Sequence, residues 1–148
     1  MEKLFFKYAD EYFRIKLLTI YKKCAGKPIL IEGKYKHNEN KKWATFINIK
    51  PYIQYRKNKF DKFCDHINID RKIIDKFYLL TDIDNYKRFL IIANIEFYNW
   101  YGRERIGIKL FEDNQIIPIL KFNKSIKLRK GILEKCYIYE KDDLQIKT

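Results

Sequence analysis

A long apolar stretch, together with the turn that follows it, constrains the fold of this chain more than any other feature. Residues 88–100 are hydrophobic along most of their length, as is typical of a strand in the middle of a sheet. The Tyr-Gly-Arg-Glu segment at 101–104 predicts a hairpin turn into a second strand over residues 105–111. We therefore expect an antiparallel sheet built around this hairpin.

Other segments show the alternation of apolar and polar residues, or the short apolar runs, that indicate strands. Within residues 43–55 the alternation places Ile47 and Ile49 on the same face, and Pro51 falls near the fraying end of the strand. The strands expected besides the hairpin cover residues 28–36, 43–55, 63–69, 116–122 and 132–139.

Two segments have the three- and four-residue apolar spacing of amphipathic helices. The first helix is expected over residues 2–25 and has a broad apolar face rich in aromatic residues. Gly26 and Pro28 are expected to end it. Asp70 has the position of an N-cap for a second, shorter helix over residues 71–80. The second helix is expected to be inserted between the strand at 63–69 and the strand at 88–100.

These elements predict a β-rich α+β fold in one domain over residues 1–148, which is the size of an ordinary single domain. The domain comprises an N-terminal helix (2–25), a β-rich core (28–140) and a frayed tail (142–148). Strands in hairpin succession with one inserted helix fit a small barrel like the oligonucleotide/oligosaccharide-binding (OB) fold. The alternative is a curved antiparallel sheet with an N-terminal helix and one inserted helix.

Composition sets the broad class of protein. Hydrophobic residues make up 47% and aromatic residues 17% of the chain, more apolar surface than a disordered chain carries. The three cysteines are far apart, odd in number and without metal-ligand spacing, which argues against a disulfide framework. With no apolar signal segment at the start and no run near the roughly 18 apolar residues of a membrane span, we expect a cytoplasmic protein with no membrane partner.

The sequence predicts no catalytic residue, no metal site and no cofactor. It has no glycine-rich phosphate loop, and His37 lies in a polar turn. Cys64 and His66 could share one face of a strand, but Asp65 points to the other face and no third group completes a catalytic or metal site. Glu32-Gly33-Lys34 has the Glu-x-Lys pattern of a metal-dependent nuclease half-site, in which an acid and a lysine share a strand face beside a phosphate. Such a site also needs an aspartate from a preceding strand, and here a helix precedes. A nuclease remains the third alternative.

The basic residues point to an acidic partner. The net charge is +13, and a field of that size attracts polyanions and speeds their encounter. Cations are concentrated over residues 34–62, where aromatic rings lie between them, over residues 121–130, and around the hairpin turn. Cations for phosphates and flat rings for bases are what single-stranded nucleic acid requires. Trp43 and Trp100 are open to either a core or a stacking role.

We therefore expect a non-catalytic protein that binds single-stranded DNA or RNA. The residues predicted to contact nucleic acid or another acidic partner are Lys34, Lys36, Tyr52, Tyr55, Arg56, Lys57, Lys59, Arg103, Arg105, Lys124, Lys127, Arg129 and Lys130.

Short motifs carry a resemblance over roughly residues 29–110: Asp65-His66-Ile67-Asn68, Ala93-x-Ile95-x-x-Tyr98, Tyr101-Gly102 and Ile106-Gly107-Ile108-Lys109. They resemble a loose group of small OB-like proteins of phages and mobile elements, which pair an Asp-His-hydrophobic step with a Tyr-Gly hairpin. The chain departs from that group at Asn68, where an aromatic residue is frequent, and in its N-terminal helix and basic C-terminal part.

The resemblance implies an OB-type barrel, no settled enzymatic role and a second class of function. Phages and mobile elements encode small inhibitors of host defence, including anti-CRISPR proteins, which act stoichiometrically on a nuclease or its guide RNA complex. A chain of this charge cannot mimic DNA, so such an inhibitor would contact RNA or an acidic protein face. The alternative partner is therefore a host nuclease–RNA complex.

Overall fold

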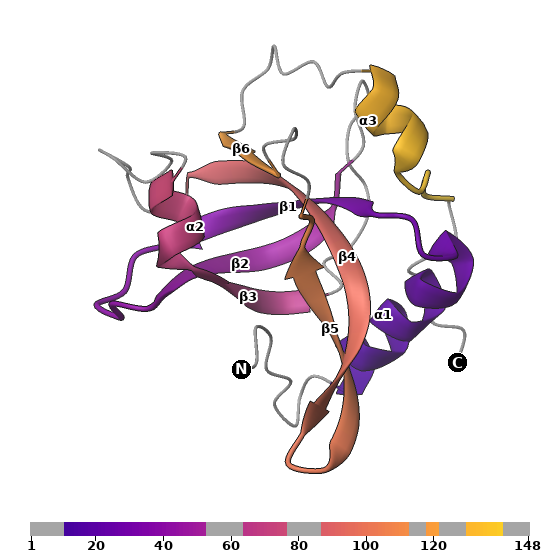
Figure 1. Cartoon of the computed structure of the whole chain (residues 1–148), viewed down its shortest axis with the longest axis horizontal. Helices are drawn as coiled ribbons and strands as arrows, with labels where there is room; N and C mark the ends of the chain where they lie inside the picture. The colour runs from indigo at the N-terminus through magenta and orange to yellow at the C-terminus, as the bar shows by residue number, and fades with distance from the viewer. Residues whose placement is uncertain (1–10, 53–63, 77–86, 113–117, 122–129, 141–148) are drawn as a thin grey trace.

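The computed structural model describes residues 11–52, 64–76, 87–112, 118–121 and 130–140. Within these residues the strands form a six-stranded antiparallel sheet in the order β3-β2-β1-β4-β5, with β6 also paired to β4 (Figure 1). The elements in chain order are α1 (Glu11–Cys24), β1 (Ile29–Lys36), β2 (Trp43–Pro51), β3 (Cys64–Asp70), α2 (Arg71–Lys76), β4 (Arg88–Trp100), β5 (Arg103–Leu110), β6 (Ile119–Lys121) and α3 (Lys130–Lys135).

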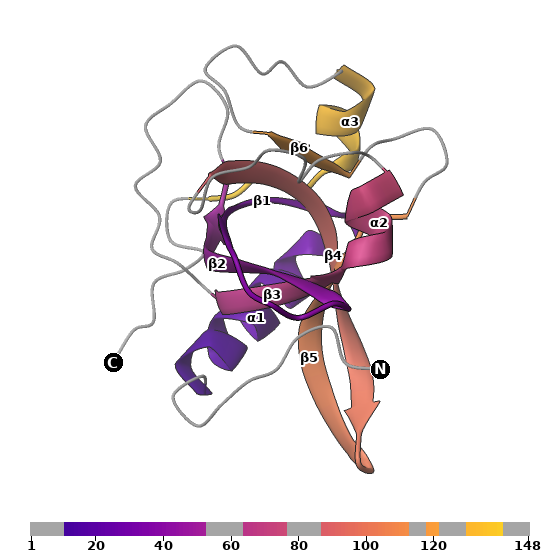
Figure 2. The same ribbon diagram turned by 90° about the vertical axis from the view of Figure 1, so that its left-hand side faces the viewer.

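The sheet is strongly curled, so it has an inner and an outer face. Figure 2 looks along the curl, and strands β1 to β4 surround a common interior. Apolar side chains from the strands and from α1 fill this interior. Among them are Phe46 and Phe89, whose rings pack edge to face with their centroids 5.4 Å apart. The β-rich α+β architecture and the inserted helix between β3 and β4 are as expected. Among the described residues, no helix has the length and apolar content needed to cross a membrane.

Strand β4 is the longest of the described strands and pairs with three of the others. One of its edges pairs with β1, and its other edge pairs first with β6 and then with β5. Its bounds agree with the prediction made from its apolar run. The hairpin is also confirmed: Tyr101 (φ 47°) and Gly102 (φ 78°) form a two-residue turn between β4 and β5. Two positive φ values are typical of a type I′ turn, whose twist matches that of the strands.

A β-bulge between β1 and β2 interrupts the alternation of side chains that was expected along the second strand. Glu32 pairs with Lys50, but Lys34 pairs with Ile47, so β2 carries one residue more than β1 at this point. The extra residue is accommodated at Asn48, whose φ of 54° lies in the left-handed region. Ile49 consequently turns into the core and is fully buried, while Ile47 stays on the outer face. The prediction that the two isoleucines share a face is wrong.

The C-terminal part also differs from the prediction. The strand expected at 132–139 is absent, because residues 130–135 form helix α3 and an extended segment follows it. In that segment the Tyr137 amide donates to the Pro28 carbonyl at 2.9 Å, and the Tyr139 hydroxyl donates to the Leu30 carbonyl at 2.6 Å. These bonds attach the segment to the start of β1 without making it a strand.

The predicted helices are confirmed where the structure describes them. Helix α1 ends at Cys24, and the first nine residues of the predicted 2–25 helix lie outside the described residues. Asp70 is the N-cap of α2, since its Oδ1 accepts a hydrogen bond from the Lys72 amide at 2.9 Å. Residues 77–80 of the predicted second helix lie outside the described residues.

Candidate nucleic-acid interface

The outer face of the sheet carries most of the charge of its central strands. Side chains alternate between faces along a strand, so the pairing register identifies which residues share the outer face. Along β1, β2, β4 and β5 the acidic residues on this face are Glu32 and Glu96. The basic residues on the same face are Lys34, Lys36, Lys50, Arg88, Arg103, Arg105 and Lys109.

Part of this face is hollowed where β2, β1 and β4 lie side by side. The hollow has a volume of about 380 Å³ and is lined by Glu32, Gly33, Lys34, Asn48, Lys50 and Arg88. The bulge at Asn48 interrupts the outer row of β2 side chains. The local irregularity of the sheet therefore makes room for a ligand.

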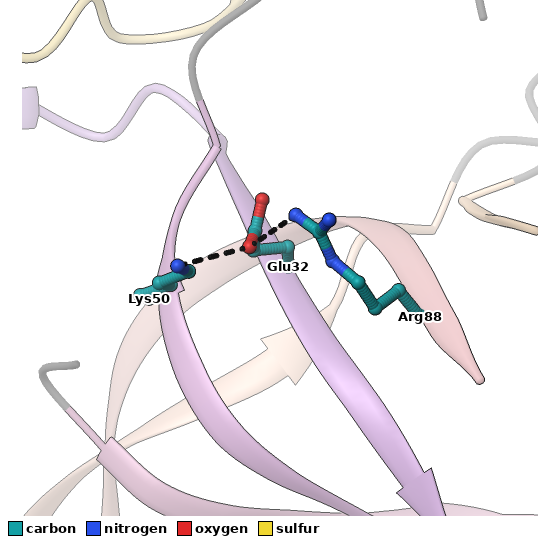
Figure 3. Close-up of polar contacts among 3 residues, drawn as sticks. All are labelled: Glu32, Lys50 and Arg88. Carbon is teal, nitrogen blue, oxygen red and sulfur yellow. Dashed lines mark hydrogen bonds and ion pairs between the residues drawn. The ribbon is translucent and has the colours of Figure 1, made fainter. Parts of the chain in front are cut away.

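Glu32 lies at the centre of the hollow and is buried, with 3% of its surface exposed. Its Oε1 accepts a hydrogen bond from Arg88 Nη2 at 2.7 Å and lies 3.4 Å from Lys50 Nζ. Figure 3 shows the two cations reaching this one carboxylate from opposite sides, Lys50 from β2 and Arg88 from β4. A buried carboxylate needs such partners, because desolvation of an unpaired charge costs several kcal/mol. The pairing in turn fixes the positions of both cations.

Lys34 completes the ring of cations. Its Cα is the register partner of the Arg88 Cα, so the two side chains lie next to each other on the outer face. Within the described part of the chain, Lys34 forms no ion pair, unlike the other two cations of the hollow. Three cations against one carboxylate leave the lining with a formal charge of +2. The arrangement favours binding of an anion.

The β4–β5 hairpin forms a second basic feature. It projects from the body of the molecule as a narrow arm (Figure 1). Tyr101 at its tip is 88% exposed, and Arg103 and Arg105 lie on the outer face of the arm. Tyr98 pairs with Arg105 on that same face. The arm thus presents an aromatic ring and guanidinium groups together, which suits both stacking on bases and contact with phosphates.

Of the residues predicted from the sequence, the structure places Lys34, Lys36, Arg103 and Arg105 on the outer face. Lys34 lines the hollow, and the two arginines lie on the hairpin arm. Seven others fall outside the described residues: Tyr55, Arg56, Lys57, Lys59, Lys124, Lys127 and Arg129. Lys130 is the first residue of α3.

The prediction that Tyr52 stacks on bases is wrong for this structure. Tyr52 is only 8% exposed and packs with Leu30, Leu90, Ile92 and Cys136 in a small apolar cluster on the outer face. Its amide also donates to the Leu30 carbonyl at 2.9 Å. The ring is therefore part of the packing under the C-terminal segment.

Trp43 is half-buried on the outer face, and the Lys42 ammonium lies 5.2 Å from its ring centroid. The tryptophan is thus outside the buried core.

Sequence reasoning missed Lys50, Arg88 and Tyr101. Nothing in the sequence near Lys50 or Arg88 links them to Glu32, because the link depends on strand register. Tyr101 stood in the predicted hairpin turn, and the exposure of turn residues was the signal that could have identified it.

The Glu-x-Lys pattern is present on one strand face, as the nuclease interpretation requires. However, the carboxylate of Glu32 is held by two cations, and this positive surrounding repels a divalent metal ion. Among the described residues no group of three or more His, Cys, Asp and Glu side chains is arranged to hold a metal.

Comparisons of this chain with protein-family models, with curated proteins and with solved structures found no match.

Proposed function

We propose that this protein is a non-catalytic nucleic-acid-binding protein that prefers single strands or RNA. The observation that carries the proposal is the convergence of Lys34, Lys50 and Arg88, from three adjacent strands, on one open hollow with an excess of positive charge. A cationic hollow on the outside of a basic protein is suited to phosphate, the one group that recurs along every nucleic acid.

The hairpin arm adds the second element of single-strand binding. A base stacked on an exposed ring gains about 1–3 kcal/mol without any sequence requirement, and Tyr101 exposes such a ring beside Arg103. Arg88 and the hairpin turn are joined by β4 itself, a path of roughly 40 Å at the rise of a strand. A flexible single strand is able to follow such a curved path, whereas a straight duplex is not.

Strand order supports the finer fold assignment that we propose with this function. An antiparallel sheet ordered β3-β2-β1-β4-β5, with a helix between β3 and β4, is the arrangement expected of an OB-like barrel. In OB folds the loop that joins strands 4 and 5 is one of the loops that bind oligonucleotides. The hairpin arm occupies that place here.

Fluorescence anisotropy with labelled single-stranded DNA, single-stranded RNA and duplex DNA tests the proposal. We expect the single strands to bind more tightly than the duplex, and their affinity to fall steeply between about 50 and 200 mM salt as counterions are released. Tyr101→Ala is expected to weaken binding at least about five-fold through lost stacking. Absence of binding to every oligonucleotide at low salt, or binding that salt does not change, contradicts the proposal.

A matched pair of charge variants separates the arm from general electrostatics. Arg103→Gln removes one cation from the arm, and Lys22→Gln removes one from the exposed last turn of α1. Both lower the net charge equally, so a long-range effect alone weakens binding equally. A larger loss for Arg103→Gln assigns binding to the arm, and equal losses count against it.

A further inference from the structure

We propose that the hollow between β2, β1 and β4 is a receptor for a terminal phosphate monoester of a nucleic acid. Lys34, Lys50 and Arg88 bind the phosphate, and Glu32 is the positioning residue that holds two of these cations. The inference rests on the proposed function and makes it more specific, because it distinguishes the end of a strand from its interior.

Charge is the first reason for a monoester. The lining carries a formal charge of +2. A phosphate monoester carries about −1.5 to −2 at pH 7, because its second ionisation has a pKa near 6. A phosphodiester inside a strand carries only one negative charge, so it leaves the hollow with an uncompensated cation. The terminal group therefore matches the hollow better than any internal phosphate.

The donors of the hollow are the second reason. An ammonium group has three N–H donors. The Lys50 ammonium lies 3.4 Å from Glu32 Oε1, and this one ion pair leaves its other donors for a ligand. Lys34 keeps all three donors for a ligand, since within the described residues its side chain has no ion pair or hydrogen bond. A terminal phosphate presents three acceptor oxygens that are free of a further ester, one more than a diester presents.

The rigidity of the cations is the third reason. Glu32 is buried among the strands, and its bond to Arg88 at 2.7 Å has the length of a charge-assisted hydrogen bond. The carboxylate therefore holds Arg88 and Lys50 in place before a ligand arrives. Binding then requires only the ordering of the Lys34 side chain, which lowers the entropic cost of capture.

The shape of the hollow also favours the end of a strand. The bulge at Asn48 opens the side of the hollow toward β2. The side chains that line it come from strands on both sides of β1. This is a local depression into which a chain end fits.

The experiment compares oligonucleotides of one sequence that carry a 5′-phosphate, a 3′-phosphate or hydroxyl groups at both ends. We expect the protein to bind one of the phosphorylated forms about ten-fold more tightly than the unphosphorylated form. A gain of this size corresponds to one or two additional charge-assisted hydrogen bonds. The preference is expected to shrink as the pH is lowered from 7 to 5, because the terminal phosphate then loses its second charge.

Lys34→Gln and Lys36→Gln form the matched pair for this test. Both residues lie on the outer face of β1 and both substitutions remove one charge, but only Lys34 lines the hollow. Both variants are expected to lose a similar part of the salt-dependent binding. Only Lys34→Gln should abolish the preference for the phosphorylated end, while Lys36→Gln retains it.

The outcomes separate this inference from the proposed function. Wild-type protein that binds all three oligonucleotides equally retains the proposed function and overturns the terminal-phosphate receptor. Equal loss of the preference in both lysine variants overturns the assignment to the hollow.

Inorganic phosphate and a mononucleotide test the hollow without an oligonucleotide. Each should raise the melting temperature of the wild-type protein and of Lys36→Gln but not of Lys34→Gln, since a ligand stabilises the state that binds it. A mononucleotide effect without any oligonucleotide binding keeps the phosphate receptor and overturns the nucleic-acid function. No effect of either ligand, together with no end preference, overturns the receptor.

Discussion

Gly33 lies in β1 at the base of the hollow, and its replacement by alanine tests the packing on which the hollow is built. A Cβ atom at this position would lie 2.7 Å from Ile49 Cδ1 and 3.4 Å from Phe46 Cβ. Carbon atoms in good contact are about 3.5–4.0 Å apart, so the first contact is a severe overlap. Ile49 is fully buried, which limits how far its side chain can move away.

The expected loss follows from two opposing terms. Overpacking of a core costs about 1–3 kcal/mol, whereas a Gly→Ala change in an accessible conformation stabilises by about 0.4–1 kcal/mol through the unfolded state. We therefore expect Gly33→Ala to lower the free energy of unfolding by about 0.5–2 kcal/mol. Ile49→Val deletes the clashing Cδ1 and alone costs about 0.5–1.5 kcal/mol.

The double variant isolates the clash. With Cδ1 removed, the new alanine has space, so Gly33→Ala combined with Ile49→Val should be at least as stable as Ile49→Val alone. The favourable coupling is expected to be about 1–2 kcal/mol, measured by urea unfolding followed by far-UV circular dichroism. Gly102→Ala is the control: its φ of 78° strains any alanine, but no atom lies within 4 Å, so its cost should not depend on Ile49. If the Gly33 and Ile49 effects add to within about 0.5 kcal/mol, the proposed overlap does not exist.

Three further predictions concern the C-terminal segment. Tyr139→Phe removes the hydroxyl that donates to the Leu30 carbonyl at 2.6 Å, and should lower the free energy of unfolding by about 1 kcal/mol in urea; an unchanged midpoint refutes a role for this bond. Burial raises the pKa of Cys136 from 9.0 to about 11, so at pH 8 its thiolate is about a hundred-fold scarcer than in an exposed thiol. In a variant whose other two cysteines are serine, iodoacetamide should therefore alkylate Cys136 about a hundred-fold more slowly in the folded protein than in urea, and equal rates would show that the thiol is accessible. Because the folded state retains this proton, the contribution of Cys136 to stability is expected to be lost as the pH rises from 9 through 11.

Local chemistry made several features of the fold predictable. The apolar run of β4 matched the observed strand at both ends, because a stretch that is hydrophobic along most of this length buries its side chains best at the centre of a sheet. Asp70 could be assigned as an N-cap because its side chain bonds to a backbone amide only two residues away. The hairpin was predictable for the same reason, since Gly102 adopts its positive φ without strain.

Features that depend on distant partners were not predictable in this way. The alternation in β2 gave the wrong face for Ile49, because the bulge at Asn48 exists only where β2 is paired with β1. Tyr52 was expected at the surface because it lies beside a proline and a basic run. It is buried because the segment that contains Cys136, far along the chain, packs over it.

The sequence by itself determined that this chain is basic, aromatic and β-rich, and that a tight turn joins its longest apolar strand to the next strand. Each of those properties resides in composition or in neighbours along the chain. Only the tertiary structure decided that Glu32 and Lys34 meet Lys50 and Arg88, residues from two other strands. Strand register brings them together, and register is set by the packing of the whole interior, because a shift of one residue would expose the side chains that the core now buries.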